Sequence, residues 1–281
     1  MHSHLVILGG GNMASAILAG GLRAGALDPS RVAVAERDPE KHGPLEAMGA
    51  RVFGAAAPAI DWMAKQEGAR PGQVLVAVKP QSFPDLAAQC GEAMGAGRRV
   101  VISIMAGVRS SRVRTLLSGE GRTVAVVRAM PNLPAQIGEG ATAVCLGSGA
   151  VPGDEAFAMS IFRGVGPLVL RTDETMMDAF TALAGSGPAY LYYLAEGLIT
   201  AGEKMGFTPE QARGTVAQTL KGAAELLSRA ENTPAQLRSA VTSKGGTTQA
   251  ATEVLDQRGV MGALVEAVRA AESRGQSLGA G

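Results

Sequence analysis

The sequence has few aromatic residues and almost no net charge. Phe, Trp and Tyr make up 4% of the 281 residues, whereas glycine contributes 38. This composition favours an α/β protein with small residues and tight turns over a β-sandwich. The net charge of +1 provides no field that would attract nucleic acid or a membrane surface. We therefore expect neither as a partner.

Cysteine is equally scarce. Cys90 and Cys145 are too far apart in sequence for a CxxC or zinc-binding motif, so we expect buried thiols and no metal site. The first residues lack the basic segment of a secretory signal, and no apolar stretch of 18 residues is free of charge. These absences favour a reducing compartment, and we expect a cytoplasmic protein.

Short β-branched runs alternate with helical periodicity through about the first 170 residues. Several runs are apolar throughout, which is typical of parallel strands covered by helices on both faces. We expect strands at residues 5–8, 32–35, 74–78, 100–104, 123–130, 142–146 and 167–170.

After Arg171 the pattern becomes helical, with no further strand-like run. Thr208 and Pro209 fit the N-cap and first position of a helix. We predict an α/β domain at residues 1–171 and an all-helical domain at residues 172–281.

A glycine cluster follows the first predicted strand. Gly9, Gly11 and Ala14 fit the pattern G-x-G-x-x-A at the start of a helix. Such glycines permit a tight turn and a close approach of backbone to a pyrophosphate, and the helix N-terminus attracts the anion. The cluster predicts a dinucleotide site. Downstream, Glu36 would bind the ribose hydroxyls of NADH, and Arg37 the 2′-phosphate of NADPH, so these residues leave both cofactors open.

Three more predicted strands end in residues suited to ligand binding. Lys79 and Pro80 follow one strand, Ala106 and Gly107 the next, and Asn132 the third. The carboxyl ends of parallel strands meet at one edge of a sheet, where open α/β sheets bind ligands. Each turn is also compatible with ordinary loop chemistry.

Candidates for a general acid are few. His2 and His4 lie at the first strand and His42 near the presumed adenosine end, while Lys204 and Lys221 do not fit the Lys-x-x-x-Asn helix of β-hydroxy acid dehydrogenases. A cyclic imine can be protonated before hydride arrives. Reduction of an imine therefore suits this sequence better than reduction of a carbonyl.

The stretch "SKGGTT" directly precedes a predicted helix. We expect Gly245 and Gly246 to expose backbone N–H groups, and Thr247, Thr248 and the helix dipole to add to a carboxylate socket. A glycine turn with an N-cap is the alternative.

A second unusual stretch lies earlier in the helical region. Gly185, Gly187 and Pro188 interrupt a helix otherwise predicted from about 173 to 205, at a cost of roughly 3 kcal/mol for the proline. Either Ser186 and the freed backbone contact nicotinamide or substrate, or the glycines allow close helix packing.

The chain resembles the pyrroline-5-carboxylate reductase family over nearly its whole length. The matching blocks are "GGGNMA" (9–14), "VKP" (78–80), "RAMPN" (128–132), "GSGPAY" (185–190) and "SKGGTT" (243–248). The resemblance implies a Rossmann-type domain, a helical dimerisation domain, and reduction of 1-pyrroline-5-carboxylate to L-proline, the last step of proline biosynthesis, with NADPH slightly favoured over NADH. Alternatives are a β-hydroxy acid dehydrogenase of the same architecture and a non-catalytic dinucleotide-binding regulatory protein.

The resemblance also implies residue roles, with Thr248 as the catalytic residue near the ring nitrogen. The implied substrate contacts are Ser186, Glu231, Ser243, Gly245, Gly246, Thr247 and Thr248. The implied cofactor contacts are Gly9, Gly11, Asn12, Met13, Glu36, Arg37, Lys79, Pro80, Ala106, Gly107 and Asn132. The family usually has Pro in place of Lys244, which bears on substrate affinity. Its members assemble through the helical domain, commonly as rings of five dimers, so we expect at least a homodimer.

Overall fold

The computed structural model describes residues 3–66, 72–95, 97–229 and 231–279. The chain forms two compact units. Unit 1 comprises Met1–Ser186 and Ala271–Gly281, and unit 2 comprises Gly187–Ala270. The change from strands to helices follows the last strand, which ends at Arg171.

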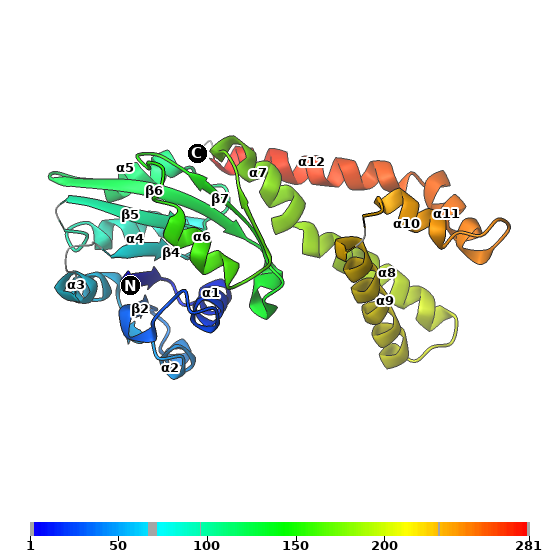
Figure 1. Cartoon of the computed structure of the whole chain (residues 1–281), viewed down its shortest axis with the longest axis horizontal. Coiled ribbons are helices and arrows are strands. Elements are labelled where there is room, and N and C mark those ends of the chain that lie inside the picture. The colour runs from blue at the N-terminus through cyan, green and yellow to red at the C-terminus, as the bar shows by residue number, and fades with distance from the viewer. Residues whose placement is uncertain (1–2, 67–71, 96, 230, 280–281) are drawn as a thin grey trace. The chain divides into compact units, whose positions relative to one another are not determined.

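Unit 1 is built on one eight-stranded sheet with the order β3-β2-β1-β4-β5-β6-β7-β8. Figure 1 shows β4, β5 and β6 of this sheet side by side. The strands β1 to β6 are parallel to one another wherever they pair. β7 is antiparallel to β6, and β8 is parallel to β7. The strands are β1 (Leu5–Leu8), β2 (Val32–Ala35), β3 (Arg51–Phe53), β4 (Gln73–Val76), β5 (Gly97–Ser103), β6 (Arg122–Pro131), β7 (Ala141–Leu146) and β8 (Leu168–Arg171).

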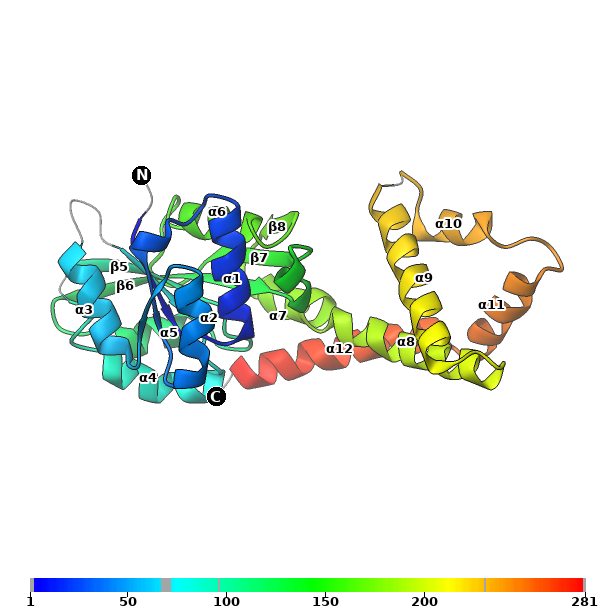
Figure 2. The same cartoon turned by 90° about the horizontal axis from the view of Figure 1, so that it is seen from below.

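Both faces of the sheet are covered by helices, as predicted. Val6 and Leu8 pack in one core with residues of α3, α4 and α5, whereas Leu5 and Ile7 pack in the other with residues of α1, α2 and α6. Figure 2 shows α4 and α6 on opposite sides of the strands. The helices are α1 (Asn12–Arg23), α2 (His42–Ala47), α3 (Ala56–Gln66), α4 (Phe83–Cys90), α5 (Ser110–Leu117), α6 (Ala156–Arg163) and α7 (Met177–Phe180), with the 3₁₀ turns η1 (Pro29–Arg31), η2 (Pro39–Lys41), η3 (Pro80–Ser82), η4 (Leu133–Ile137) and η5 (Glu174–Met176).

The predicted interruption of the long helix is present. α7 leads into η6 (Thr181–Gly185), a π-helical segment, and α8 (Gly187–Lys204) begins after Ser186. The backbone N–H of Ser186 donates to the Thr181 carbonyl five residues earlier, at 2.8 Å. The glycine and proline residues therefore change the helical hydrogen-bond pattern locally.

Unit 2 contains α8, α9 (Pro209–Arg229), α10 (Pro234–Ala240), α11 (Thr247–Gln257) and the first part of α12 (Val260–Gly279). The predicted helix start at Thr208 is confirmed, because its hydroxyl accepts the Gln211 N–H at 3.2 Å. Many large apolar side chains of this unit are exposed, among them Leu191, Tyr192, Tyr193, Leu198, Leu226, Leu227, Val254, Leu255 and Val265. In the described ranges, no helix combines the length and apolar character that crossing a membrane requires.

Candidate active site

A cavity of about 470 Å³ lies at the carboxyl ends of β1, β2 and β4. β1 lies between β2 and β4, so the cavity is at the point where the strand order reverses, the usual ligand site of an open α/β sheet. It brings together five of the predicted cofactor residues, Gly9, Gly11, Glu36, Arg37 and Lys79. It also includes Lys41, Ser82 and Gln89, which sequence analysis missed because no motif marks them.

Gly9 and Gly11, the two glycines of the motif, suit their positions for different structural reasons. Gly9 has a φ of +100°, and a Cβ there would lie 3.0 Å from both the Ala77 carbonyl oxygen and Val78 Cγ1. Gly11 is the N-cap of α1, and a Cβ there would meet no atom of the described residues within 4 Å. Gly9 thus serves the protein's own packing, whereas Gly11 leaves space beside the helix N-terminus. An anionic pyrophosphate fits this arrangement.

Two other predicted cofactor residues begin α1. Asn12 is exposed at the start of the helix, and Met13 is half-buried against the core on the α1 side of the sheet. Neither lines the cavity in this structure.

The carboxylate of Glu36 is held by backbone N–H groups. Its Oε2 accepts from Gly10 at 2.7 Å and its Oε1 from Asp38 at 2.9 Å. The neighbouring Arg37 is exposed at the cavity. Lys41 lies there too, with its Nζ 3.3 Å from an Asp38 carboxylate oxygen. The cavity therefore has two cationic side chains at the end of β2.

The turns after β4 and β5 are arranged differently from each other. Lys79 is exposed on the cavity wall and precedes η3, whose first residue is Pro80. Ala106 is half-buried, while Gly107 is buried with a φ of +69°. A Cβ on Gly107 would lie 2.9 Å from Leu278 Cβ, because the end of α12 covers this turn. Pro80, Ala106 and Gly107 do not line the cavity.

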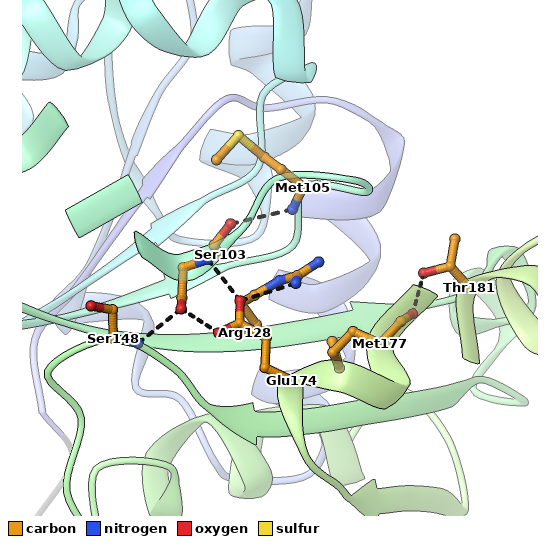
Figure 3. Close-up of polar contacts among 8 residues, drawn as sticks. Ser103, Met105, Arg128, Ser148, Glu174, Met177 and Thr181 are labelled. Carbon is orange, nitrogen blue, oxygen red and sulfur yellow. Dashed lines mark hydrogen bonds and ion pairs between the residues drawn. The ribbon is translucent and has the colours of Figure 1, made fainter. Parts of the chain in front are cut away.

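A polar network behind the β5 turn has no counterpart in the sequence analysis (Figure 3). Glu174 accepts the backbone N–H of Ser110 at 2.7 Å and its hydroxyl at 2.5 Å, and it pairs with Arg128 Nη1 at 3.1 Å. The Ser110 hydroxyl in turn accepts the Ser148 N–H at 2.8 Å. Burial raises the pKa of Glu174, but the hydrogen bonds from Ser110 and the charge of Arg128 outweigh it and lower this pKa.

Asn132 lies at the end of β6 and is 9% exposed. Its Oδ1 accepts the Ala141 N–H at 2.9 Å, and its Nδ2 donates to the Ala184 carbonyl at 3.1 Å. Both ends of the side-chain amide thus contact backbone. Ser186, two residues after Ala184, is half-buried.

The loop before α11 corrects one expectation. Gly245, at φ +73°, donates its N–H to Gln249 Oε1 at 2.7 Å, and Gly246 donates to the Ser243 carbonyl at 3.0 Å. The expectation that both N–H groups are exposed donors is therefore wrong. Two other kinds of hydrogen-bond donor remain at this loop. The N–H groups in the first turn of α11 have no partner within the helix, and Thr247 and half-buried Thr248 carry hydroxyl groups. Glu231, Ser243 and Lys244 are exposed.

The described histidines have other partners. His4 stacks edge-on against Trp62, with ring centroids 5.9 Å apart, and His42 Nε2 lies 2.7 Å from the Glu36 carbonyl oxygen. His2 lies outside the described residues. Cys90 and Cys145 are free and buried as predicted, and burial raises the pKa of each thiol to about 11.

The doubly covered sheet, the glycine loop at a helix N-terminus and the cavity at the strand-order reversal define a Rossmann-type dinucleotide-binding protein. Residues 4–107 match the family model for NADP oxidoreductase, coenzyme F420-dependent. Residues 174–278 match the model for pyrroline-5-carboxylate reductase dimerisation. The chain is 39% identical over 280 residues to the pyrroline-5-carboxylate reductase of Synechocystis, covering 99% of each. It belongs to the pyrroline-5-carboxylate reductase family.

Solved structures agree with this assignment. The pyrroline-5-carboxylate reductase of Coxiella burnetii superposes with a TM-score of 0.85 at 31% identity, covering 99% of both chains. The pyrroline carboxylate reductase of Plasmodium falciparum, solved with NADP bound, gives a TM-score of 0.83 at 24% identity, covering 99% of this chain and 98% of the other. The second comparison shows the same fold.

Proposed function

We propose that this protein reduces 1-pyrroline-5-carboxylate to L-proline with NADPH or NADH. The observation that carries the proposal is the similarity to pyrroline-5-carboxylate reductases along the whole chain, from the glycine loop to the last helix. The cavity adds physical support, since its glycine loop and cationic rim suit a dinucleotide.

The residues present fit the cofactor. Gly11 leaves room beside the N-terminus of α1 for the pyrophosphate, and Asn12 and Met13 begin that helix. Arg37, which lines the cavity, is proposed to bind a 2′-phosphate, with Glu36 holding the glycine loop. Lys79, Pro80, Ala106 and Gly107 are proposed for the remainder of the cofactor, because they follow β4 and β5. When bound, the reduced nicotinamide supplies a hydride.

The substrate carboxylate is proposed to bind at the start of α11. The first-turn N–H groups, the helix dipole and the hydroxyls of Thr247 and Thr248 offer donors to an anion without an arginine. Ser243, Gly245 and Gly246 shape the loop through their own hydrogen bonds. Exposed Lys244 adds positive charge that attracts the carboxylate.

Thr248 is the proposed catalytic residue, with its hydroxyl beside the ring nitrogen, and Ser186 and Glu231 are proposed to border the ring. A protonated imine is already electrophilic, so positioning is the main task of these side chains. A strong protein acid is not required. His4 contacts Trp62 and His42 contacts the Glu36 carbonyl oxygen, which is consistent with a reaction that uses no histidine as the acid.

The test is NADPH oxidation followed optically after addition of 1-pyrroline-5-carboxylate, with a β-hydroxy acid and NADP⁺ as the control reaction. We expect turnover with the imine only, and its absence would reject the proposal. Thr248→Ala should lower kcat/KM for the imine about tenfold or more. The matched control is Thr219→Ala, which removes a threonine hydroxyl bonded within α9. An unchanged kcat/KM in Thr248→Ala would remove Thr248 from the mechanism.

The helical part is proposed to form a homodimer. Its match to a dimerisation model and its exposed apolar side chains both favour a second copy as the cover, because large exposed apolar patches mark interfaces. A ring of five dimers is the proposed larger assembly, from the family resemblance, and mass measurement in solution tests it. We place the enzyme in the cytoplasm, where buried free thiols such as Cys90 and Cys145 stay reduced.

A further inference from the structure

Pro188 leaves one carbonyl of the preceding turn without its ordinary hydrogen-bond donor. In an α-helix the carbonyl of one residue accepts the N–H of the residue four positions later. Proline has no N–H. Ala184 lies four positions before Pro188, so its carbonyl lacks the donor that a regular α-helix would supply.

Asn132 provides that donor. Its Nδ2 lies 3.1 Å from the Ala184 carbonyl oxygen, while its Oδ1 accepts the Ala141 N–H at 2.9 Å. Only the amide nitrogen can donate to a carbonyl and only the amide oxygen can accept an N–H, so the two contacts fix the orientation of the side chain. The tether is well shielded from water, because Asn132 is 9% exposed.

The turn held in this way is the π-helical segment η6. Such segments within α-helices are frequent at functional sites. Ser186 follows η6 directly and closes it through the 2.8 Å bond from its N–H to the Thr181 carbonyl. The turn also packs on the end of β6, since a Cβ on Gly185 would lie 3.0 Å from Met130 Cε. The end of β6 and Asn132, the residue that follows it, therefore both contact the turn.

We propose that Asn132 is a positioning residue, which holds the turn bearing Ser186 by hydrogen-bonding the Ala184 carbonyl, whose α-helical donor is missing at Pro188. The inference rests on the proposed function, in which Ser186 borders the substrate. It assigns Asn132 an indirect role in place of the cofactor contact that its sequence motif suggested.

The first test is Asn132→Asp, which preserves size and the acceptor for Ala141 but puts an oxygen opposite the Ala184 carbonyl. We expect kcat/KM for the imine to fall about tenfold or more, because the part-buried Ala184 carbonyl loses its side-chain donor. KM for NADPH should change by less than about twofold. The opposite pattern, a raised KM for NADPH with normal imine kinetics, would overturn the proposal in favour of cofactor contact.

The second test is rescue by a backbone donor. Asn132→Ala removes the side-chain donor, and adding Pro188→Ala restores an N–H four residues after Ala184. The Ala141 bond is lost in both variants, so their difference reports on the Ala184 carbonyl. We expect the double variant to recover most of the imine kcat/KM that Asn132→Ala loses. If it recovers none while both variants remain folded by thermal denaturation, the proposed tether is wrong.

The matched control is Thr142→Val on the neighbouring strand. Thr142 pairs with Pro131 and is 1% exposed, and its hydroxyl has no hydrogen-bond partner within the described part of the chain. This isosteric change should leave both KM values and kcat within about twofold of wild type. Failure of the wild type to reduce the imine would instead reject the proposed function. Normal wild-type turnover with unaltered Asn132→Asp kinetics would reject only the role of Asn132.

Discussion

Glu36 and Gly10 are joined by a 2.7 Å hydrogen bond from the backbone N–H of the glycine loop to carboxylate Oε2. The other carboxylate oxygen accepts the Asp38 N–H at 2.9 Å. The residue that an NADH-binding protein would use for ribose hydroxyls is thus also a structural support for the loop. Arg37 is exposed at the same cavity, and we propose that it distinguishes the two cofactors.

Arg37→Ala should raise KM for NADPH about tenfold, because a charge-assisted hydrogen bond to the 2′-phosphate is lost. NADH lacks that phosphate, so its KM should change by less than about twofold. Steady-state kinetics with each cofactor measures both values. Arg163→Ala, an exposed arginine on α6, is the control for loss of one positive charge. Equal increases for the two cofactors would show that Arg37 does not read the phosphate.

Alanine at Gly9 should affect stability, whereas alanine at Gly11 should affect NADPH binding. Gly9→Ala should destabilise the fold by at least about 1–2 kcal/mol, because an L-residue is strained at positive φ and the new Cβ contacts the Ala77 carbonyl oxygen and Val78 Cγ1 at 3.0 Å. Gly11→Ala should preserve the melting temperature but weaken NADPH binding, since its Cβ enters the space proposed for the pyrophosphate. Thermal denaturation and nucleotide titration separate the effects. A Gly11→Ala protein with normal NADPH affinity would contradict the proposed cofactor position.

Glu174→Gln should destabilise the protein at neutral pH by on the order of 1–3 kcal/mol, since buried Arg128 loses its charged partner. The pKa of Glu174 is lowered in the folded state, so the carboxylate stabilises the fold above its unfolded pKa of about 4.3. That contribution is lost as pH falls through the lower, folded-state pKa. The stability difference between wild type and variant should therefore shrink below about pH 4.3.

Denaturant titrations between neutral and acid pH measure this difference. The control is Glu139→Gln, which removes an exposed carboxylate from unit 1. We expect it to change stability by less than about 0.5 kcal/mol at neutral pH. A Glu174→Gln effect of the same size at neutral and acid pH would mean that the charge of Glu174 does not stabilise the fold.

Both cysteines should be unreactive in the native protein. Burial raises the pKa of Cys90 and Cys145 to about 11, so at pH 8 about one thiol in a thousand is ionised, and the thiolate is the reactive form. A thiol-specific chromogenic reagent should react slowly with the folded protein and rapidly with both thiols after denaturation. Fast reaction of the native protein would show that one of these residues is accessible.

Local sequence patterns predicted most of the fold. Uniformly apolar runs such as residues 5–8 and 32–35 coincide with β1 and β2, because buried parallel strands leave little room for polar residues. β3 was missed because it has three partly exposed residues. The antiparallel direction of β7 was not predicted either, because the direction of a strand depends on the segment that connects it to the strand before it. The short segment after β6 permits only a return in the opposite direction, whereas a parallel neighbour needs a long crossover.

The candidate site was predicted less evenly. Gly9, Gly11, Glu36, Arg37 and Lys79 follow recognisable strand ends, and they line one cavity. Lys41 was not predicted because no motif marks it, and the Glu174 network was not predicted because it joins segments far apart in sequence. The prediction that Gly245 and Gly246 expose their N–H groups was wrong for a different reason. The acceptors, Gln249 and Ser243, lie only a few residues away, but a pattern of glycines does not show how the loop turns toward them.

The sequence by itself determined which segments become strands and helices, where the glycine loop lies and where Pro188 removes a donor, because these properties depend on residues close along the chain. Only the tertiary structure decided which distant groups complete those segments. Asn132 reaches Ala184 from 52 positions away, and Glu174 reaches Ser110 from 64. Hydrogen bonds act over about 3 Å in space, and separation along the sequence does not reveal which groups folding brings that close.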